Sequence, residues 1–316
     1  MGTKIERDVT HATGAHAVRI SNAEVELLVA TDIGPRVLGY RHHGLRNVFG
    51  WLDPAAQAKP TSFGEPWHIY GGHRLWHAPE HAELSYVPDN RPVPFRVEDD
   101  GSLVVGGEVE QATALRKELR IRLDDEGSRV RVEHVITNAG PAAVDIAVWA
   151  LSVMAPGGTA FFPTAPFVPF PDALLPSSRL VLWPYSSLAD PRFTFGPRFL
   201  RLRHDAGAEA PQKVGLLDAH HGWAAYALEG RLFVKRFAPA ALGARHVDLG
   251  CNVESFTDHA ILELETLGPE VHLAPGASTT HVEEWFLFAD LPVSGDESEV
   301  ASAITSALAH AEMARH

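Results

Sequence analysis

The chain has 316 residues, of which 45% are hydrophobic and 21% charged, as is usual for a globular protein with a sizeable core. Its 27 basic and 40 acidic residues give a formal net charge of −13, which argues against nucleic acid or an anionic membrane as a partner. The single cysteine, Cys251, excludes an internal disulfide framework and a multi-cysteine zinc site, and we expect it to fill space in a strand.

Nothing in the sequence predicts a membrane segment or a leader. No apolar run reaches the roughly 18 residues that a spanning helix needs. The first 14 residues, MGTKIERDVTHATG, lack the apolar stretch of a signal peptide. We therefore expect a cytoplasmic location.

The first half of the chain predicts a succession of β-strands separated by turn signals such as NAGP and DDEG. The expected strands are 15–21, 23–30, 35–42, 93–99, 102–110, 112–125, 128–138 and 142–154. Between them, residues 51–70 are richer in proline, glycine and polar residues, and they predict a loop that lies over a site.

The second half begins with the proline-rich segment 156–212, which predicts long excursions with short strands. Strands are then expected at 213–220, 223–228, 231–237 and 252–258. Residues 294–315 predict the one helix, with an apolar stripe of Val300, Ile304 and Leu308. The pattern indicates a single all-β domain over residues 1–316, with two large antiparallel sheets packed face to face and one C-terminal helix.

Two carboxylates stand out in the stretch HAILELETLGPEVHLAPGASTTHVEEWFLF, residues 259–288. Glu263 and Glu265 are two residues apart on an expected strand and therefore share one face. They are either a solvated strand face or a pair for proton transfer in a pocket, because a carboxylate crowded by another acquires a raised pKa. Glu254 joins them if its strand forms a hairpin with theirs, and three acids then require a cation from Lys213, Arg74, a protonated histidine or a metal ion.

The second notable stretch is EPWHIYGGHRLWHAPEH, residues 65–81, which holds four histidines, two tryptophans and an arginine around Gly71 and Gly72. We expect a loop that recognises a polar ligand; the alternative is an aromatic plug at the end of the sandwich. His73 and His77 are four residues apart, but the glycines and Pro79 disfavour the helix that a metal pair would need. The sequence therefore predicts neither a metal site nor a cofactor.

Several of these motifs resemble the galactose mutarotase-like, or aldose 1-epimerase-like, superfamily. The similar segments are LELETLGP, GGHRLWHAPE, IGPRVLGYRHHGLRNVFGW and VRVEHVITNAGPAAVDIAVWALSVM. Within the superfamily, the GGHRLWHAPE, LFVKRF and NVE…LELETLGP blocks are most similar to an uncharacterised bacterial branch of DUF4380 type. The resemblance implies a β-supersandwich of galactose mutarotase type.

The resemblance also implies a site. Glu265 falls on the catalytic base of the family, whereas Trp149 stands where the family has its catalytic histidine. His134 lies before that position on the face of a strand that points to the core. The acid would then come from His73 or His77. Substrate-binding roles are expected for Arg74, Trp76, Lys213, Trp223, Glu254 and Glu263.

Three functions follow as alternatives. The first is an aldose 1-epimerase-like acid/base enzyme acting on a sugar or another small polyoxygenated metabolite. The second is proton-transfer chemistry on a non-sugar metabolite: dehydration, conjugate addition or cyclisation, or epimerisation. The third is a non-catalytic carbohydrate-binding protein. The expected partner is a small-molecule substrate, without nucleic acid or membrane, and a homodimer is left open.

Overall fold

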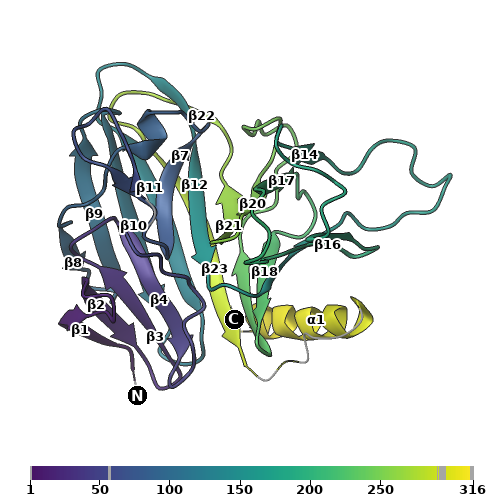
Figure 1. The fold of residues 1–316 in the computed structure, drawn as a ribbon, viewed down its shortest axis with the longest axis horizontal. Helices are drawn as coiled ribbons and strands as arrows, with labels where there is room; N and C mark the ends of the chain where they lie inside the picture. Colours follow the sequence, from purple (N-terminus) through teal and green to yellow (C-terminus); the bar gives the residue numbers. More distant parts are fainter. Residues whose placement is uncertain (1, 56–57, 290, 292–296, 314–316) are drawn as a thin grey trace.

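The computed structural model describes residues 2–55, 58–289, 291 and 297–313. Two large antiparallel sheets pack against each other and enclose the main apolar core (Figure 1). The prediction of an all-β sandwich with a C-terminal helix is therefore confirmed.

The first sheet has 11 strands. In spatial order they are β1 (Lys4–Thr10), β2 (His16–Ser21), β3 (Val25–Ala30), β4 (Arg36–His42), β7 (His73–Ala78), β12 (Val144–Met154), β21 (Leu262–Leu267), β20 (Val253–Thr257), β17 (Gln212–Leu216) and β14 (Leu180–Leu182), with β22 (Val271–Leu273) paired to β12.

The second sheet has 10 strands. Their order is β15 (Phe193–Phe195), β16 (Phe199–Arg203), β13 (Thr159–Pro163), β18 (Trp223–Leu228), β19 (Arg231–Arg236), β23 (Ser278–Phe288), β11 (Val130–Asn138), β10 (Leu115–Leu123), β9 (Leu103–Glu110) and β8 (Phe95–Val97). A third, two-stranded sheet pairs β5 (Ala58–Lys59) with β6 (Trp67–His68). A short 3₁₀ turn, η1 (Leu84–Tyr86), lies between β7 and β8 in the chain.

The strands show two burial patterns. In β10 and β11, buried residues alternate with more exposed ones, because one face packs on the core and the other meets solvent. In β12, by contrast, every residue from Ile146 to Met154 is buried. This strand lies between β7 and β21 at the centre of its sheet, and its outer face is covered by side chains of a cavity described below.

The prediction of a loop over residues 65–81, whose centre at 71–80 was expected to bind the ligand, is wrong, because strand β7 (His73–Ala78) runs through that centre. Gly71 and Gly72 permit its entry into the sheet. Both have positive φ, +107° and +69°, and a Cβ on either would collide with the backbone oxygen of Gly50 or Val37. The two glycines thus bring the chain close to its neighbours and set which side chains of β7 face outward.

Helix α1 (Glu297–Met313) lies on the outer face of the second sheet (Figure 1). Its buried residues Val300 and Ile304 and the partly buried Leu308 form the predicted stripe against that sheet. Residues 294–296 and 314–315, at the ends of the predicted helix, lie outside the described residues. Among the described helical residues, no segment has the length and apolarity needed to cross a bilayer.

The proline-rich excursion contains a feature used later. Residues 164–179, between β13 and β14, form a long connection that we call the arm. It extends away from both sheets, as the teal loop at the right of Figure 1.

Candidate functional site

A cavity of about 380 Å³ opens on the outer face of the first sheet, over β7, β12, β20 and β21. Its walls combine aromatic and charged side chains. The aromatic ones are Trp67, Trp76, Tyr86, Trp149, Tyr185 and Phe256, and the charged ones are Lys59, Arg74, Glu80, Lys213, Asp258 and Glu263. Small-molecule sites in proteins have this size and this mixture of apolar walls with a few polar groups.

Strand register brings the central side chains together. Leu151 of β12 lies opposite Arg74 on β7 and opposite Glu265 on β21, so the three side chains share the outer face. Two residues along β12, Trp149 lies on the same face opposite Trp76. Three strands distant in sequence therefore build the cavity floor.

The hairpin of β20 and β21 places Glu254 directly opposite Glu265. The Nζ atom of Lys213 lies 3.0 Å from Glu254 Oε2 and 3.2 Å from Glu265 Oε2. Next to this group, Arg74 Nη1 lies 2.8 Å from Glu263 Oε1. The three carboxylates expected to converge do so, and a lysine and an arginine supply the cations.

Burial dominates the electrostatics of this cluster. It raises the pKa of Glu254 to about 8, against the attraction of Lys213 and with added repulsion from Glu265. Burial likewise raises the pKa of Glu265, opposed by Lys213 and reinforced by Glu263. For Lys213, burial acts to lower the pKa, but the two carboxylates beside it raise it well above the usual value. Lys213 is thus charged at neutral pH, and the two carboxyl groups beside it hold their protons more tightly than an exposed glutamate does.

Glu265 is held beneath the cavity floor. Its Oε2 accepts a hydrogen bond of 2.9 Å from Trp149 Nε1 in addition to the contact with Lys213. The side chain is fully buried, whereas Lys213 and Trp149 line the cavity above it. Its Oε1 is buried without a hydrogen-bond partner among the described residues. A ligand in the cavity therefore meets Lys213 before it meets Glu265.

Aromatic faces hold the cations in place. The Arg74 guanidinium lies 4.5 Å from the ring centroid of Trp76. Lys213 Nζ lies 4.6 Å from the centroid of Trp149 and 4.7 Å from that of Trp183. Cation–π contacts of this kind are strongest where water is excluded. The rings also offer flat apolar surfaces next to hydrogen-bonding groups.

The two histidines expected as acids do not line the cavity. Because β7 is a strand, His73 and His77 alternate with Arg74 and Trp76 and point between the sheets. Burial lowers the pKa of His77 to about 3, and Lys117 lowers it further. Both imidazoles are neutral core residues at physiological pH.

Trp223, expected in the same site, also lies elsewhere. It belongs to β18 of the second sheet and packs beneath α1, with its ring centroid 5.9 Å from that of Phe199. Trp223 begins a strand of the other sheet, and the sequence pattern does not reveal which sheet that strand joins. Cys251 is buried as expected, but it precedes β20 instead of lying in a strand, and burial raises the pKa of its thiol.

Other cavity residues escaped sequence reasoning. Tyr86 and Tyr185 line the cavity and come from connections without a periodic pattern. Trp183, which lies against Lys213, comes from the same connection as Tyr185. A partial signal existed, since residues 51–70 predict a loop over a site, and Lys59 and Trp67 of this segment do line the cavity.

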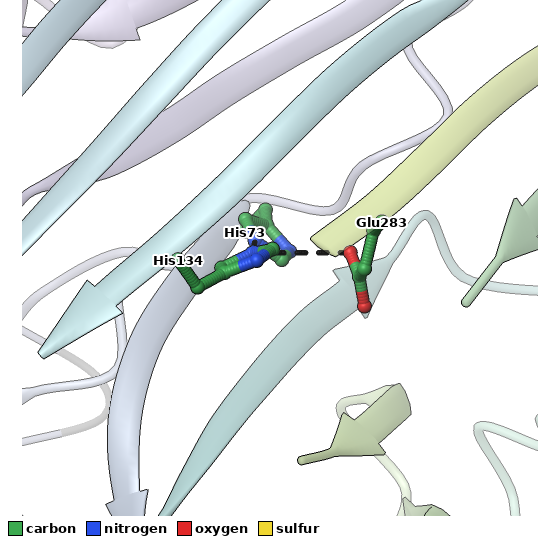
Figure 2. Close-up of side chains that lie close together, drawn as sticks. All are labelled: His73, His134 and Glu283. Carbon is green, nitrogen blue, oxygen red and sulfur yellow. Dashed lines mark hydrogen bonds and ion pairs between the residues drawn. The ribbon is translucent and has the colours of Figure 1, made fainter. Parts of the chain in front are cut away.

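A second buried polar cluster lies on the core side of the same strands (Figure 2). His73 Nε2 lies 2.6 Å from His134 Nε2, and His73 Nδ1 lies 2.8 Å from Ser152 Oγ. Lys235 Nζ lies 3.0 Å from Glu283 Oε1. This cluster joins the two sheets directly behind the cavity.

The ligand atoms of His73, His134 and Glu283 lie within 4.8 Å of one another, which makes this cluster a candidate metal site (Figure 2). Two nitrogens bound to one tetrahedral zinc ion stand about 3.3 Å apart, whereas these are 2.6 Å apart. The ammonium of Lys235 already contacts the glutamate. The residues therefore fit a hydrogen-bonded network better than a metal centre. The absence of zinc stays a prediction for elemental analysis.

Another cavity, of about 390 Å³, lies near β9, but Phe63 is the only aromatic side chain among its described lining residues, and its charged groups include two ion pairs. Glu65 contacts Arg91 at 2.9 Å, and Glu110 contacts Lys117 at 2.7 Å. The outer face of β7, β12 and β21 is therefore the stronger candidate.

No family model matches the sequence, and no curated protein matches it at a significant level. The likeness to a DUF4380-type branch therefore stays a prediction. Solved structures do match the fold.

The chain is similar to a TPR-domain-containing protein from Parabacteroides distasonis, with a TM-score of 0.60 and 15% identity over 88% of this chain. It spans 48% of the length of that protein. An aldose 1-epimerase candidate from Klebsiella pneumoniae matches with a TM-score of 0.58 and 13% identity, over 96% of this chain and 86% of that one.

A galactose mutarotase-like protein from Lactobacillus casei matches with a TM-score of 0.53 and 11% identity, over 86% of this chain and all of that one (100%). At such identities the likeness concerns the fold alone. The chain has the galactose mutarotase-like fold.

Proposed function

We propose that the cavity binds a small polyhydroxylated molecule such as an aldose and catalyses proton transfer on it, as an aldose 1-epimerase-like isomerase. The observation that carries the proposal is Lys213, which lines the cavity and contacts both Glu254 and Glu265. A buried lysine between two carboxylates of raised pKa is an arrangement typical of functional sites.

Anomer exchange requires two proton transfers. One group takes the proton of the anomeric hydroxyl, and another gives a proton to the ring oxygen as its bond to the anomeric carbon breaks. Glu263 lines the cavity and is the acceptor in this scheme, with Arg74 holding its carboxylate. Lys213 is the donor, and Glu265 holds its ammonium from behind. Ring closure on the other face of the carbonyl reverses both transfers: Lys213 regains its proton, and Glu263 gives its proton back to the anomeric oxygen. The aromatic walls hold the apolar face of the ring.

A second candidate is carbohydrate binding without turnover. It is favoured by the position of His73 and His77, which leaves the lining of the cavity, as far as the structure describes it, without an imidazole. The raised pKa of Lys213 also makes its ammonium a weak acid. Both observations support slow exchange of glucose or galactose anomers even if these sugars bind.

Polarimetry and ligand titration on a panel of aldoses and polyols separate the two candidates. The isomerase predicts accelerated anomer exchange that is lost in Lys213→Met and in Glu265→Gln. Lys117→Met is the matched control, since Lys117 is another buried lysine paired with a glutamate, and it should leave exchange unchanged. Binding without exchange supports the second candidate, and neither binding nor exchange for any member of the panel would remove both.

A further inference from the structure

The arm exposes large apolar side chains to an unusual degree. Phe167 is 89% exposed, Phe170 85%, Leu174 75% and Leu175 85%. All four lie within residues 164–179, on the segment that extends away from the two sheets (Figure 1). They therefore pack against almost nothing in their own chain.

The size of this apolar surface is large for an arm of this length. A phenylalanine can bury about 150–250 Å², so the four side chains together present roughly 600 Å². The largest apolar patch of a typical monomer is about 300–600 Å² and is often functional. One short connection thus carries as much apolar surface as the largest patch of an ordinary protein.

The apolar surface continues at the base of the arm. Leu180, 43% exposed, begins β14, the last strand at one end of the first sheet. Arg179 Nη1 donates a hydrogen bond of 3.3 Å to the carbonyl of Gly250, whose neighbour Leu249 is 81% exposed. The arm is therefore anchored beside further exposed leucines and next to a sheet edge.

We propose that the arm is a self-association surface, which packs against the arm of a second copy of this chain in a two-fold symmetric dimer. In such a dimer each copy buries its arm, so the total reaches roughly 1,200 Å², the lower limit for stable specific interfaces.

Charge also favours a second copy. The arm contains one acid, Asp172, and one base, Arg179. In a two-fold dimer the acid of each arm can face the base of the other. An anionic lipid surface is disfavoured as the occupant, because the chain has a formal net charge of −13.

Sedimentation velocity across micromolar concentrations tests the proposal on the full chain. Wild type should be a dimer, and a variant with Phe167→Ser, Phe170→Ser, Leu174→Ser and Leu175→Ser should be a monomer, with the dimer weakened at least about 100-fold. The matched control, Leu45→Ser with Val109→Ser, replaces exposed apolar residues outside the arm and should stay dimeric. Circular dichroism verifies that both variants keep the β fold.

Three results would overturn the proposal. The first is a monomeric wild type at these concentrations. The second is a dimer that the four serine substitutions leave intact. The third is a monomer that binds zwitterionic lipid vesicles through the arm, which would make the arm a membrane-contact element instead.

Discussion

Two buried lysine–glutamate clusters lie on the two sides of strands β7, β12 and β21, one in the core and one below the cavity. They differ in how many of their polar atoms have a hydrogen-bond partner. On the core side, Glu283 accepts hydrogen bonds from Trp285 and Thr266 and contacts Lys235. On the cavity side, two carboxylates share Lys213, and Glu265 Oε1 has no hydrogen-bond partner among the described residues.

The pKa values follow this difference. Burial acts to raise the pKa of Glu283, but Lys235 and the nearby histidines lower it below its usual value. For Glu254 and Glu265, burial prevails over Lys213 and the pKa rises. A network in which every polar atom is hydrogen-bonded, as in the core, fixes how the two sheets pack together. A network with unpaired polar atoms and raised pKa values, as below the cavity, keeps groups that can bind a ligand or transfer a proton.

The largest expected effect is on the core side. Lys235→Met leaves the charge of Glu283 unpaired in the core and should lower the free energy of unfolding by about 3–5 kcal/mol. The double variant with Glu283→Gln should recover most of this loss. Urea unfolding of both variants beside Lys213→Met provides the measurement. A Lys213→Met variant that loses more stability than Lys235→Met would reverse the comparison.

On the cavity side the effect should fall on function. Glu265→Gln should lower turnover by about 100-fold or more, or abolish ligand binding if the protein only binds. The free energy of unfolding should change by less than about 1 kcal/mol or increase, since repulsion with Glu263 is relieved. Glu26→Gln, at another buried carboxylate held by arginines, is the matched control for ligand titration. Unchanged binding and turnover in both Glu263→Gln and Glu265→Gln would remove this strand from the site.

A third prediction concerns pH. The pKa of Glu254 is raised from 4.5 to about 8 in the folded chain, so the unfolded chain releases this proton first. The group therefore lowers stability progressively as pH rises from about 4.5 to about 8, and its effect is absent below that range. Glu254→Gln should flatten this part of the stability–pH curve. Denaturant titrations at half-unit steps check it, and parallel curves for variant and wild type would refute the raised pKa.

The smallest effect is expected at an exposed pair that joins β12 to β22. His272 Nδ1 and Asp145 Oδ1 lie 2.9 Å apart, with both side chains more than half exposed. Solvent screens such pairs, so Asp145→Asn should leave the unfolding midpoint unchanged. A thermal melt tests this. A clear loss of stability would mean that an exposed ion pair contributes to the stability of this protein as a buried one does.

The alternation of side chains along the expected strands predicted much of the fold and part of the site. It placed Glu263 and Glu265 on one strand face, and Lys213 and Arg74 were among the four kinds of cation that it offered to neutralise them. It did not separate His73 from Arg74, because the segment was expected to be a loop, where neighbouring side chains have no fixed alternation. Trp223 was wrongly expected in the cavity for another reason. The sequence pattern of a strand does not indicate which of the two sheets the strand belongs to.

The core cluster was beyond sequence reasoning altogether. Lys235 and Glu283 are separated by long stretches of chain and meet only because β19 pairs with β23. A charged residue within a strand is also most often solvated, so its sequence gives no sign of burial. Such pairs become visible only when the order of the strands is known.

The position of Lys213 between two indoles gives the cavity an optical readout. Indole emission depends on nearby charge, and this ammonium lies over Trp149 and Trp183 while Trp149 donates its N–H to Glu265. A ligand that displaces Lys213, or a proton gained by Glu265, alters the surroundings of these two fluorophores at once. Trp223 and Trp285 lie buried in other parts of the fold and provide a constant background. Candidate metabolites can therefore be screened on the unlabelled protein by its own fluorescence.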